Sequence, residues 1–170
     1  LRPVGRLDKD SEGLLLMTDD GAFINMLTHP SGGVGKLYRV TVNPRATEQQ
    51  IIEMSSGVVL DDGVKTRPCV IHVVVDEPGR SVLEITLHEG RNRQIRRMCS
   101  AVGLQVVRLR RSAEGPVKLG MLQPGEYREL KKSEINALRN AAMKSAGKGA
   151  SRAASPVRRP GPLKKRTNSD

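Results

Sequence analysis

The chain of 170 residues has almost no aromatic side chains: one Phe, two Tyr and no Trp. Proteins that read single-stranded RNA usually stack successive bases on several aromatic faces. Phe23, Tyr38 and Tyr127 are too few for such a stacking platform, which we therefore exclude. Recognition of one base by one ring stays open.

Cysteine and histidine are also scarce. Cys69 and Cys99 lie within apolar stretches and lack the paired spacing of a zinc site or a disulfide framework, so we expect buried free thiols. His29, His72 and His88 are scattered, with no pair at the spacing of helical metal ligands, so we expect no catalytic metal. Phosphate-loop and serine-elbow patterns are missing too. Any chemistry must therefore use carboxylates, arginines or a tyrosine.

Long apolar runs are missing as well. None approaches the roughly 18 residues needed to cross a bilayer, and no signal peptide opens the chain. We therefore expect a cytoplasmic protein without a membrane partner. Because the chain begins with Leu1 and its first residues already resemble the interior of a domain, we expect that an N-terminal part is missing.

Acidic residues are outnumbered, since 29 Lys and Arg against 18 Asp and Glu give a net charge of +11. This excess favours a polyanionic partner, because cationic side chains release the counterions condensed on phosphates. Residues 141–170 alone carry +7, from eight basic residues and one acidic residue. Such a tail is either a sequence-independent RNA tether or a solvated extension.

Strand and helix patterns are mixed without strict alternation, which predicts an α+β fold with a mixed, mainly antiparallel sheet and flanking helices. We expect one domain over residues 1–142 and a disordered basic tail over 143–170, where Gly, Ser, Pro, Lys and Arg dominate. The expected strands span 13–18, 36–42, 58–64, 69–75, 81–88, 105–111 and 127–130. The expected helices are a short one ending at residue 28 and others over 47–55, with a capping box at Thr47 and Gln50, 92–102 and 133–142.

Two charged segments stand out. GRLDKDSEG, residues 5–13, crowds charges around Asp8 just before an apolar run, although such a cluster is usually only a solvated loop. EGRNRQIRRM, residues 89–98, places Ile95 and Met98 on one helix face. Arg96 lies at the flank of that face, half turned toward the core. It is either a snorkelling side chain or a buried partner for a carboxylate.

Taken in order, several motifs give the chain a family resemblance. They are GRLD, SEGLLL, TDDG, HPS with KLYRV, EGRNRQIRRM, VVRLRR and LQPGEYREL, and they run from about Pro3 to Leu138. This set resembles the small-subunit type of ribosomal RNA pseudouridine synthases, a family that also includes several large-subunit enzymes. The resemblance implies the catalytic fold of that family, without its N-terminal part. It also implies an isomerase that extrudes a specific uridine of ribosomal RNA and converts it to pseudouridine.

The resemblance also implies roles for individual residues. Asp8 is the catalytic aspartate, acting as nucleophile or as base; Tyr38 is the active-site tyrosine; and Arg96 is the arginine paired with the aspartate. A guanidinium would keep a buried carboxylate ionised and oriented. No cofactor is implied, because no electrons or groups enter or leave. Without the resemblance, Tyr38 would be read as a strand residue packing on the sheet.

Further expected contacts fall into two groups. The pocket is expected to be lined by Leu109, Arg6 and Leu7. RNA is expected to be bound by Lys9, Lys36, Arg91, Asn92, Arg93, Gln94, Arg97, Arg110 and Arg111. We expect a monomer whose partner is ribosomal RNA, with the large subunit favoured over the small because EGRNRQIRR is closer to the large-subunit enzymes.

Two rival interpretations remain. The first is a non-catalytic RNA-binding or ribosome-associated protein that keeps the same fold. The second is a DNA-binding protein with the arginine-rich helix in a major groove, which an inward-facing Arg96 disfavours.

Overall fold

The computed structural model describes residues 1–29 and 33–152 of the chain. Its strands are β1 (Arg2–Pro3), β2 (Glu12–Gly13), β3 (Met17–Thr18), β4 (Lys36–Asn43), β5 (Val70–Glu77), β6 (Arg80–Leu87), β7 (Gln105–Glu114) and β8 (Val117–Lys118). Its helices are α1 (Gly21–Thr28), α2 (Glu48–Ser56), α3 (Gln94–Ala101) and α4 (Lys132–Arg152).

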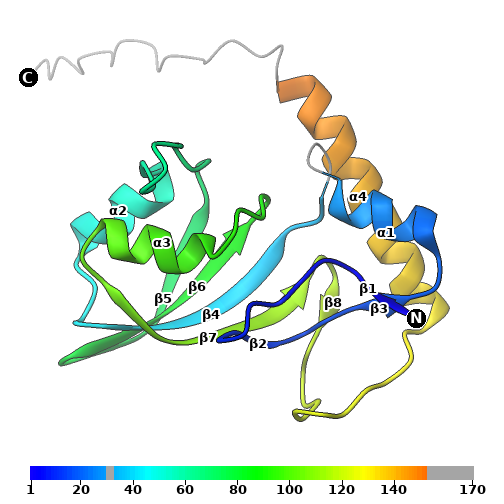
Figure 1. Cartoon of the computed structure of the whole chain (residues 1–170), viewed down its shortest axis with the longest axis horizontal. Helices are drawn as coiled ribbons and strands as arrows, with labels where there is room; N and C mark the ends of the chain where they lie inside the picture. The colour runs from blue at the N-terminus through cyan, green and yellow to red at the C-terminus, as the bar shows by residue number, and fades with distance from the viewer. Residues whose placement is uncertain (30–32, 153–170) are drawn as a thin grey trace, which may run out of the picture.

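The central sheet is built around β4, which pairs antiparallel with β6 on one side and β7 on the other. β5 extends the sheet antiparallel beyond β6, whereas β2 joins β7 in parallel. The strand order is therefore β2-β7-β4-β6-β5, with β8 paired to β7 (Figure 1). This arrangement confirms the predicted α+β fold with a mainly antiparallel sheet.

Helices α2 and α3 cover one face of the sheet and enclose the larger core (Figure 1). Val40 and Leu83 point into it from the sheet, and Ile95, Met98 and Cys99 point into it from α3. The predicted apolar face of α3 is thus confirmed. Burial of each of these larger aliphatic side chains stabilises the fold by roughly 1.5–3 kcal/mol.

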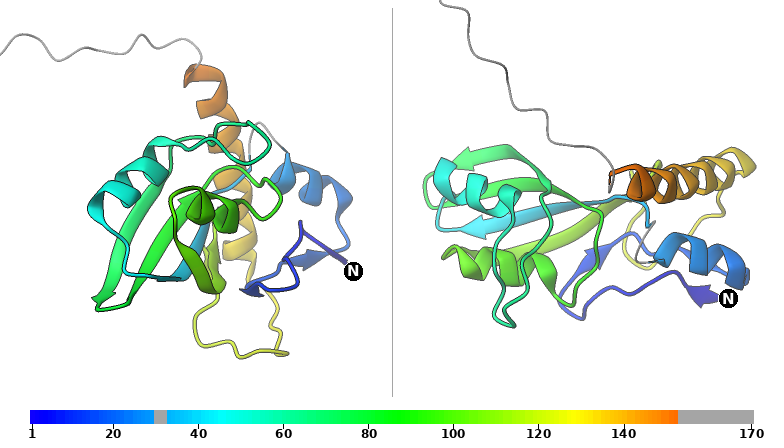
Figure 2. Two further views of the ribbon diagram at one scale, coloured as in Figure 1. Left: turned by 60° about the vertical axis from the view of Figure 1, so that its left-hand side comes forward. Right: turned by 90° about the horizontal axis from the view of Figure 1, so that it is seen from above.

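A second core lies where α1 packs against α4, away from α2 and α3 (Figure 2). Phe23 and Leu27 of α1 meet Leu138 and Ala142 of α4, and Leu14 joins them from the N-terminal segment. The long strands β4 and β7 reach from the first core toward the second (Figure 1). The site described below lies where the two cores meet.

Both cysteines are free thiols, as predicted. Cys99 is fully buried, and burial raises its pKa to about 12. Cys69 is only half-buried, yet burial still raises the pKa of its thiol to about 11. Neither thiol is therefore ionised at neutral pH, so neither acts as a nucleophile there.

Three predicted strands differ from the structure. The segment 13–18 is not one strand, because only its ends pair, in β2 and β3. The segment 58–64 forms only an isolated bridge, because the Leu60 and Val64 backbones close a tight loop around an Asp-Asp-Gly turn. The segment 127–130 has no strand pairing, and Tyr127 is 91% exposed.

The predicted capping box of α2, between Thr47 and Gln50, is present. The last helix, in contrast, differs from the prediction at its C-terminal end. Helix α4 runs to Arg152, ten residues past its predicted end at Ala142. The structure therefore differs from the predicted disorder over residues 143–152, which it places in α4. The rest of the predicted tail, 153–170, lies outside the described residues.

Gly13 allows β2 to lie directly against β7. Its φ of +112° belongs to a region that side chains disfavour, and a Cβ built there would overlap the carbonyl oxygen of Arg111. Since β2 ends the segment that carries Asp8, this close approach fixes one end of that segment on the sheet.

Replacement of this glycine tests the close approach. Gly13→Ala is expected to cost about 3 kcal/mol or more and to lower the Tm by roughly 6–12 °C in a thermal unfolding experiment. The control is Gly63→Ala, at φ +83° with no atom within 4 Å of the added Cβ. It should cost only the backbone penalty of about 1–2 kcal/mol. Equal losses in the two variants would contradict the steric argument.

Candidate active site

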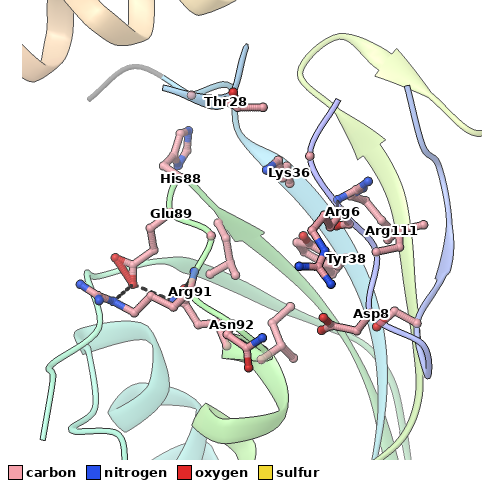
Figure 3. Close-up of a pocket in the computed structure, with 18 of the residues that line it drawn as sticks. Arg6, Asp8, Thr28, Lys36, Tyr38, His88, Glu89, Arg91, Asn92 and Arg111 are labelled. Carbon is pink, nitrogen blue, oxygen red and sulfur yellow. Dashed lines mark hydrogen bonds and ion pairs between the residues drawn. The ribbon is translucent and has the colours of Figure 1, made fainter. Parts of the chain in front are cut away.

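A pocket of about 690 Å³ lies between the two cores, a volume typical of sites for small ligands. Its walls are the loop between β1 and β2, the end of α1, strand β4 and the loop between β6 and α3. Leu109 and Arg111 of β7 also line it. Figure 3 shows the charged and polar side chains that surround the cavity.

Asp8 lies in the loop between β1 and β2, and its carboxylate points into the pocket (Figure 3). The carboxylate forms no hydrogen bond or ion pair with any residue in the described part of the chain. Its backbone is fixed locally, because the Ser11 N–H donates a 2.9 Å hydrogen bond to the Asp8 carbonyl oxygen. The carboxylate is therefore held in place by its backbone and remains available to a ligand.

Arg96 does not make the contact that the resemblance implies. Its Nη2 donates a 2.7 Å hydrogen bond to the backbone carbonyl oxygen of Asp10, and its Nε is buried without a partner. Within residues 1–29 and 33–152, no ion pair joins Arg96 to the Asp8 carboxylate. The predicted flank position on α3 is nevertheless correct, since Arg96 is half-buried. Arg96 fixes the Asp8 loop through the main chain two residues further on.

Arg111 also holds this loop, and its position corrects the prediction that it grips phosphates at the surface. The side chain is only 2% exposed. Its Nε donates a 2.8 Å hydrogen bond to the Leu14 carbonyl oxygen, and its Nη1 a longer one of 3.5 Å to the Arg6 carbonyl oxygen. Its Nη2 is buried and has no hydrogen-bond partner in the part of the chain that the structure describes. Residues on both sides of Asp8 are thus tied to β7 by one guanidinium.

Tyr38 and Leu109 line the same pocket as Asp8. Tyr38 is half-buried on β4 and packs against the larger core, as the strand interpretation also required. Leu109 is 5% exposed on β7, where it pairs with Val40. Arg6 lines the pocket too, and Figure 3 shows it near Tyr38. The structure therefore brings the predicted aspartate, tyrosine and leucine to one cavity.

Leu7 also lines the pocket, as predicted. Lys9 follows Asp8 in the same loop and is exposed, outside the cavity itself.

The loop between β6 and α3 forms the opposite rim. Arg91, Asn92 and Arg93 line the pocket there, as residues predicted to bind RNA. Arg93 adopts a left-handed φ of +48°, uncommon for a residue other than Gly, and its Nη1 lies 3.4 Å from a carboxylate oxygen of Asp10. The Arg91 side chain turns to Glu89, with its Nε 3.7 Å from a carboxylate oxygen (Figure 3).

Gln94, predicted to bind RNA, lines the pocket and also supports this rim. It is 4% exposed, and its Nε2 donates a 2.7 Å hydrogen bond to Glu89, whose carboxylate also accepts from the Arg67 backbone N–H. The Arg91 N–H donates to the Gln94 side-chain oxygen at 3.2 Å. Sequence reasoning missed Glu89, although an acidic residue directly before an arginine cluster is a signal for such a hub.

Two other predicted RNA contacts lie outside the pocket. Arg97 turns toward the 61–62 turn, where its Nη2 is 2.6 Å from Asp61 and 3.0 Å from Asp62. Arg110 is half-buried and projects from the face of β7 opposite Leu109, because successive side chains of a strand alternate. Neither residue contributes to the cavity wall.

Lys36 was predicted to bind RNA, and the structure places it in the pocket wall, half-buried on β4. Burial lowers the pKa of its ammonium group, whereas the nearby Glu114 raises it. Glu114 is 1% exposed, and burial raises the pKa of its carboxyl group against the opposing effect of Arg111 and Lys36. Three ionisable groups therefore cluster at the pocket wall: Glu114 and Arg111 are buried and Lys36 is half-buried.

The described residues contain no group of three or more His, Cys, Asp or Glu side chains that could hold a metal ion. Among the same residues, no helix has the length and apolarity needed to span a bilayer.

The sequence of this chain is similar to those of known RNA-modifying proteins. A family described as RNA pseudouridylate synthase matches residues 1–101. An RNA pseudouridine synthase of Aquifex aeolicus is 42% identical over 133 residues, which are 78% of this chain and 53% of that protein. The ribosomal large subunit pseudouridine synthase B of Bacillus subtilis is 39% identical over 150 residues, covering 87% of this chain and 60% of that protein.

The fold is similar as well. The crystal structure of a pseudouridylate synthase superposes with a TM-score of 0.75 at 36% identity, covering 80% of this chain and 58% of that one. The chain thus spans about half to three fifths of the length of the relatives it matches. On its sequence, its fold and the residues gathered in its pocket, the chain belongs to the RNA pseudouridylate synthase family.

Proposed function

We propose that this chain isomerises a specific uridine of ribosomal RNA to pseudouridine, with Asp8 as the catalytic carboxylate. The observation that carries the proposal is an Asp8 carboxylate that has no partner among the described residues and points into a cavity that Tyr38 and Leu109 also line. A carboxylate left free in an otherwise well-bonded loop is available to the sugar or the base of a bound nucleotide.

The reaction sets the demands on this site. The bond between N1 of the base and C1′ of the sugar breaks, the base rotates, and a bond between C5 and C1′ forms. The proton on C5 is lost and N1 gains one, so atoms and electrons balance without a cofactor. Asp8 acts either as the nucleophile or as the base that removes a sugar proton.

A uridine stacked in RNA cannot reach a carboxylate at this depth, so the nucleotide must be extruded into the pocket at a cost of a few kcal/mol. The Tyr38 ring, set in the wall of the same cavity, stacks on the extruded base and offsets about 1–3 kcal/mol of that cost. Leu109 supplies an apolar contact beside it.

Around the pocket, the RNA backbone is held by cationic and polar groups on the two rims. Lys9 stands on the Asp8 loop, and Arg91, Asn92 and Arg93 stand on the opposite loop. The name of the Bacillus subtilis relative supports ribosomal RNA of the large subunit as the substrate. Action on that RNA in turn supports a cytoplasmic location.

Residues 1–142 are proposed as the catalytic unit. The second core ends at Ala142, so this range contains every residue of the two hydrophobic cores.

Removal of the charge on Asp8 tests whether the protein is an enzyme or a non-catalytic RNA-binding protein. Asp8→Asn is expected to lower pseudouridine formation by about 10³-fold or more while leaving RNA affinity within about threefold, because the amide keeps the shape of the carboxylate but cannot replace its charge. Release of tritium from ribosomal RNA labelled at C5 of uridine measures the rate. Mapping of pseudouridine in a deletion strain, with and without the gene, identifies the site.

The matched control is Asp10→Asn in the same loop. It removes only an exposed ion pair with Arg93 and keeps the carbonyl contact to Arg96, so activity should stay within about fivefold of wild type. Unchanged modification of RNA in the Asp8→Asn strain would reject the enzymatic role.

Substitution of Tyr38 tests the stacking role. Tyr38→Ala is expected to lower kcat/KM by about 5–150-fold, the equivalent of a lost stack of about 1–3 kcal/mol. Tyr38→Phe keeps the ring and should therefore bind RNA as wild type does, so any remaining loss in kcat reports on the hydroxyl. A Phe variant that binds RNA as weakly as the Ala variant would argue against stacking.

A further inference from the structure

The ionisable side chains of Lys36, Arg111 and Glu114 meet where β4 and β7 pair, beside the pocket. The register places Lys36 opposite Glu114 and Tyr38 opposite Arg111. A β-bulge between Leu37 and Tyr38 brings these two pairs together. Lys36, Tyr38 and Arg111 all line the cavity, so two cationic groups flank the proposed stacking ring.

Both cations belong to the cavity wall, and Arg111 holds a buried donor there. Arg111 is 2% exposed and lines the pocket, and its Nη2 has no partner although the side chain is otherwise fixed by carbonyl oxygens. The Lys36 Nζ lies beside Gly90 across the pocket, 4.0 Å from the position of a Cβ on that residue. A buried donor without a partner costs about 1–3 kcal/mol, which a ligand acceptor would recover.

Glu114 is the acidic member of this cluster. It is 1% exposed, it acts electrostatically on both Lys36 and Arg111, and its Oε2 has no hydrogen-bond partner. No ion pair within 4.0 Å joins it to either cation in the described part of the chain. An ionised Glu114 carboxylate offsets one of the two positive charges without occupying their donors.

We propose that Lys36 and Arg111 form a subsite for a carbonyl oxygen of the extruded uracil, backed by Glu114. This inference rests on the proposed function and adds the groups that recognise the base. Uracil presents the acceptor O4 where cytosine presents an amino donor, so a site made of donors favours uridine over cytidine. A buried polar site rejects an analogue that leaves it unpaired by as much as about 10⁴-fold.

The same donors also act during the reaction. When the N1–C1′ bond breaks, its electron pair passes to the base, and negative charge spreads onto the ring carbonyl oxygens. Donors already held in the wall of the cavity stabilise this charge without reorganising. Lys36 and Arg111 are therefore expected to affect kcat more than KM.

A charge-matched pair of variants tests the subsite. Lys36→Met is expected to lower kcat by about 10²–10³-fold, the loss typical of one oxyanion donor, with KM within about threefold. Arg39→Met removes one positive charge from the exposed face of the same strand and should change kcat by less than about threefold. Lys36→Arg keeps the charge and should restore most of the rate. Tritium release from ribosomal RNA labelled at C5 of uridine is the readout, after thermal unfolding has shown that each variant folds.

The pH profile provides a readout that a structural role would not change. The pKa of Lys36 is lowered by burial, so the wild-type rate should fall on the alkaline side as the ammonium group loses its proton. In Lys36→Arg the group stays charged, and this fall should move to higher pH. The other ionisable groups around Lys36 are Glu114 and Arg111 on β7, His88 and Glu89 in the adjoining loop, and Tyr38 on β4. All of them are present in wild type and in Lys36→Arg, so a difference between the two pH profiles reports on residue 36.

The outcomes separate the two proposals. Wild-type protein that releases no tritium would reject the proposed function itself. An active wild type with an unchanged Lys36→Met rate would overturn only the subsite. A rise in KM and a smaller salt dependence at constant kcat would also overturn it, because Lys36 would then bind a phosphate instead of the base. Once the target is mapped, wild-type protein that binds RNA with cytidine at that position as tightly as the uridine RNA would contradict the proposed selectivity.

Discussion

The contacts of arginine side chains with backbone carbonyl oxygens determine where Asp8 lies. Arg96 holds the Asp10 carbonyl from α3, and Arg111 holds the Leu14 carbonyl from β7. Hydrogen bonds from a charged donor stabilise a fold by about 1.5–3 kcal/mol each, enough to order a short loop. Since these contacts use the main chain on either side of Asp8, they fix the loop without engaging the carboxylate. A direct ion pair to Asp8 would instead have to be broken or shared when substrate binds.

The two hydrophobic cores explain why the pocket can be preorganised. One core joins the sheet to α2 and α3, and the other joins α1 to α4. β4 and β7 reach from one core toward the other, so residues such as Tyr38 and Leu109 are set by strand pairing that both cores support. The cavity walls on loops are in turn fixed by buried hubs such as Glu89. Ligand groups therefore meet side chains whose positions depend on rigid elements and buried contacts.

Periodicity and capping were enough to predict much of this fold. The α2 capping box, the apolar face of α3 and most long strands are local properties of the sequence, and the family motifs brought Asp8, Tyr38 and Leu109 to one site. The errors arose where tertiary contacts decide. The hydrogen-bond partner of Arg96 depends on which oxygen atom the fold places nearest to its guanidinium group. The burial of Arg111 depends on a glycine, Gly13, that lets another strand approach. The spacing of residues along the chain predicts neither of these contacts.

Stability alone gives no reason for the charged cluster at the end of β7. Burial of Lys36, Arg111 and Glu114 without close pairing costs free energy, and apolar side chains of similar volume would fill the space at lower cost. Among the described residues, four buried side-chain atoms have no hydrogen-bond partner, and two of them belong to this cluster. The Arg111 Nη2 belongs to a side chain of the cavity wall, and Glu114 lies opposite another such side chain, Lys36. Fixed donors in a partly buried site interact more strongly with a developing charge than the same donors would in solvent. The energetic cost of the cluster is therefore concentrated where a bound base could recover it.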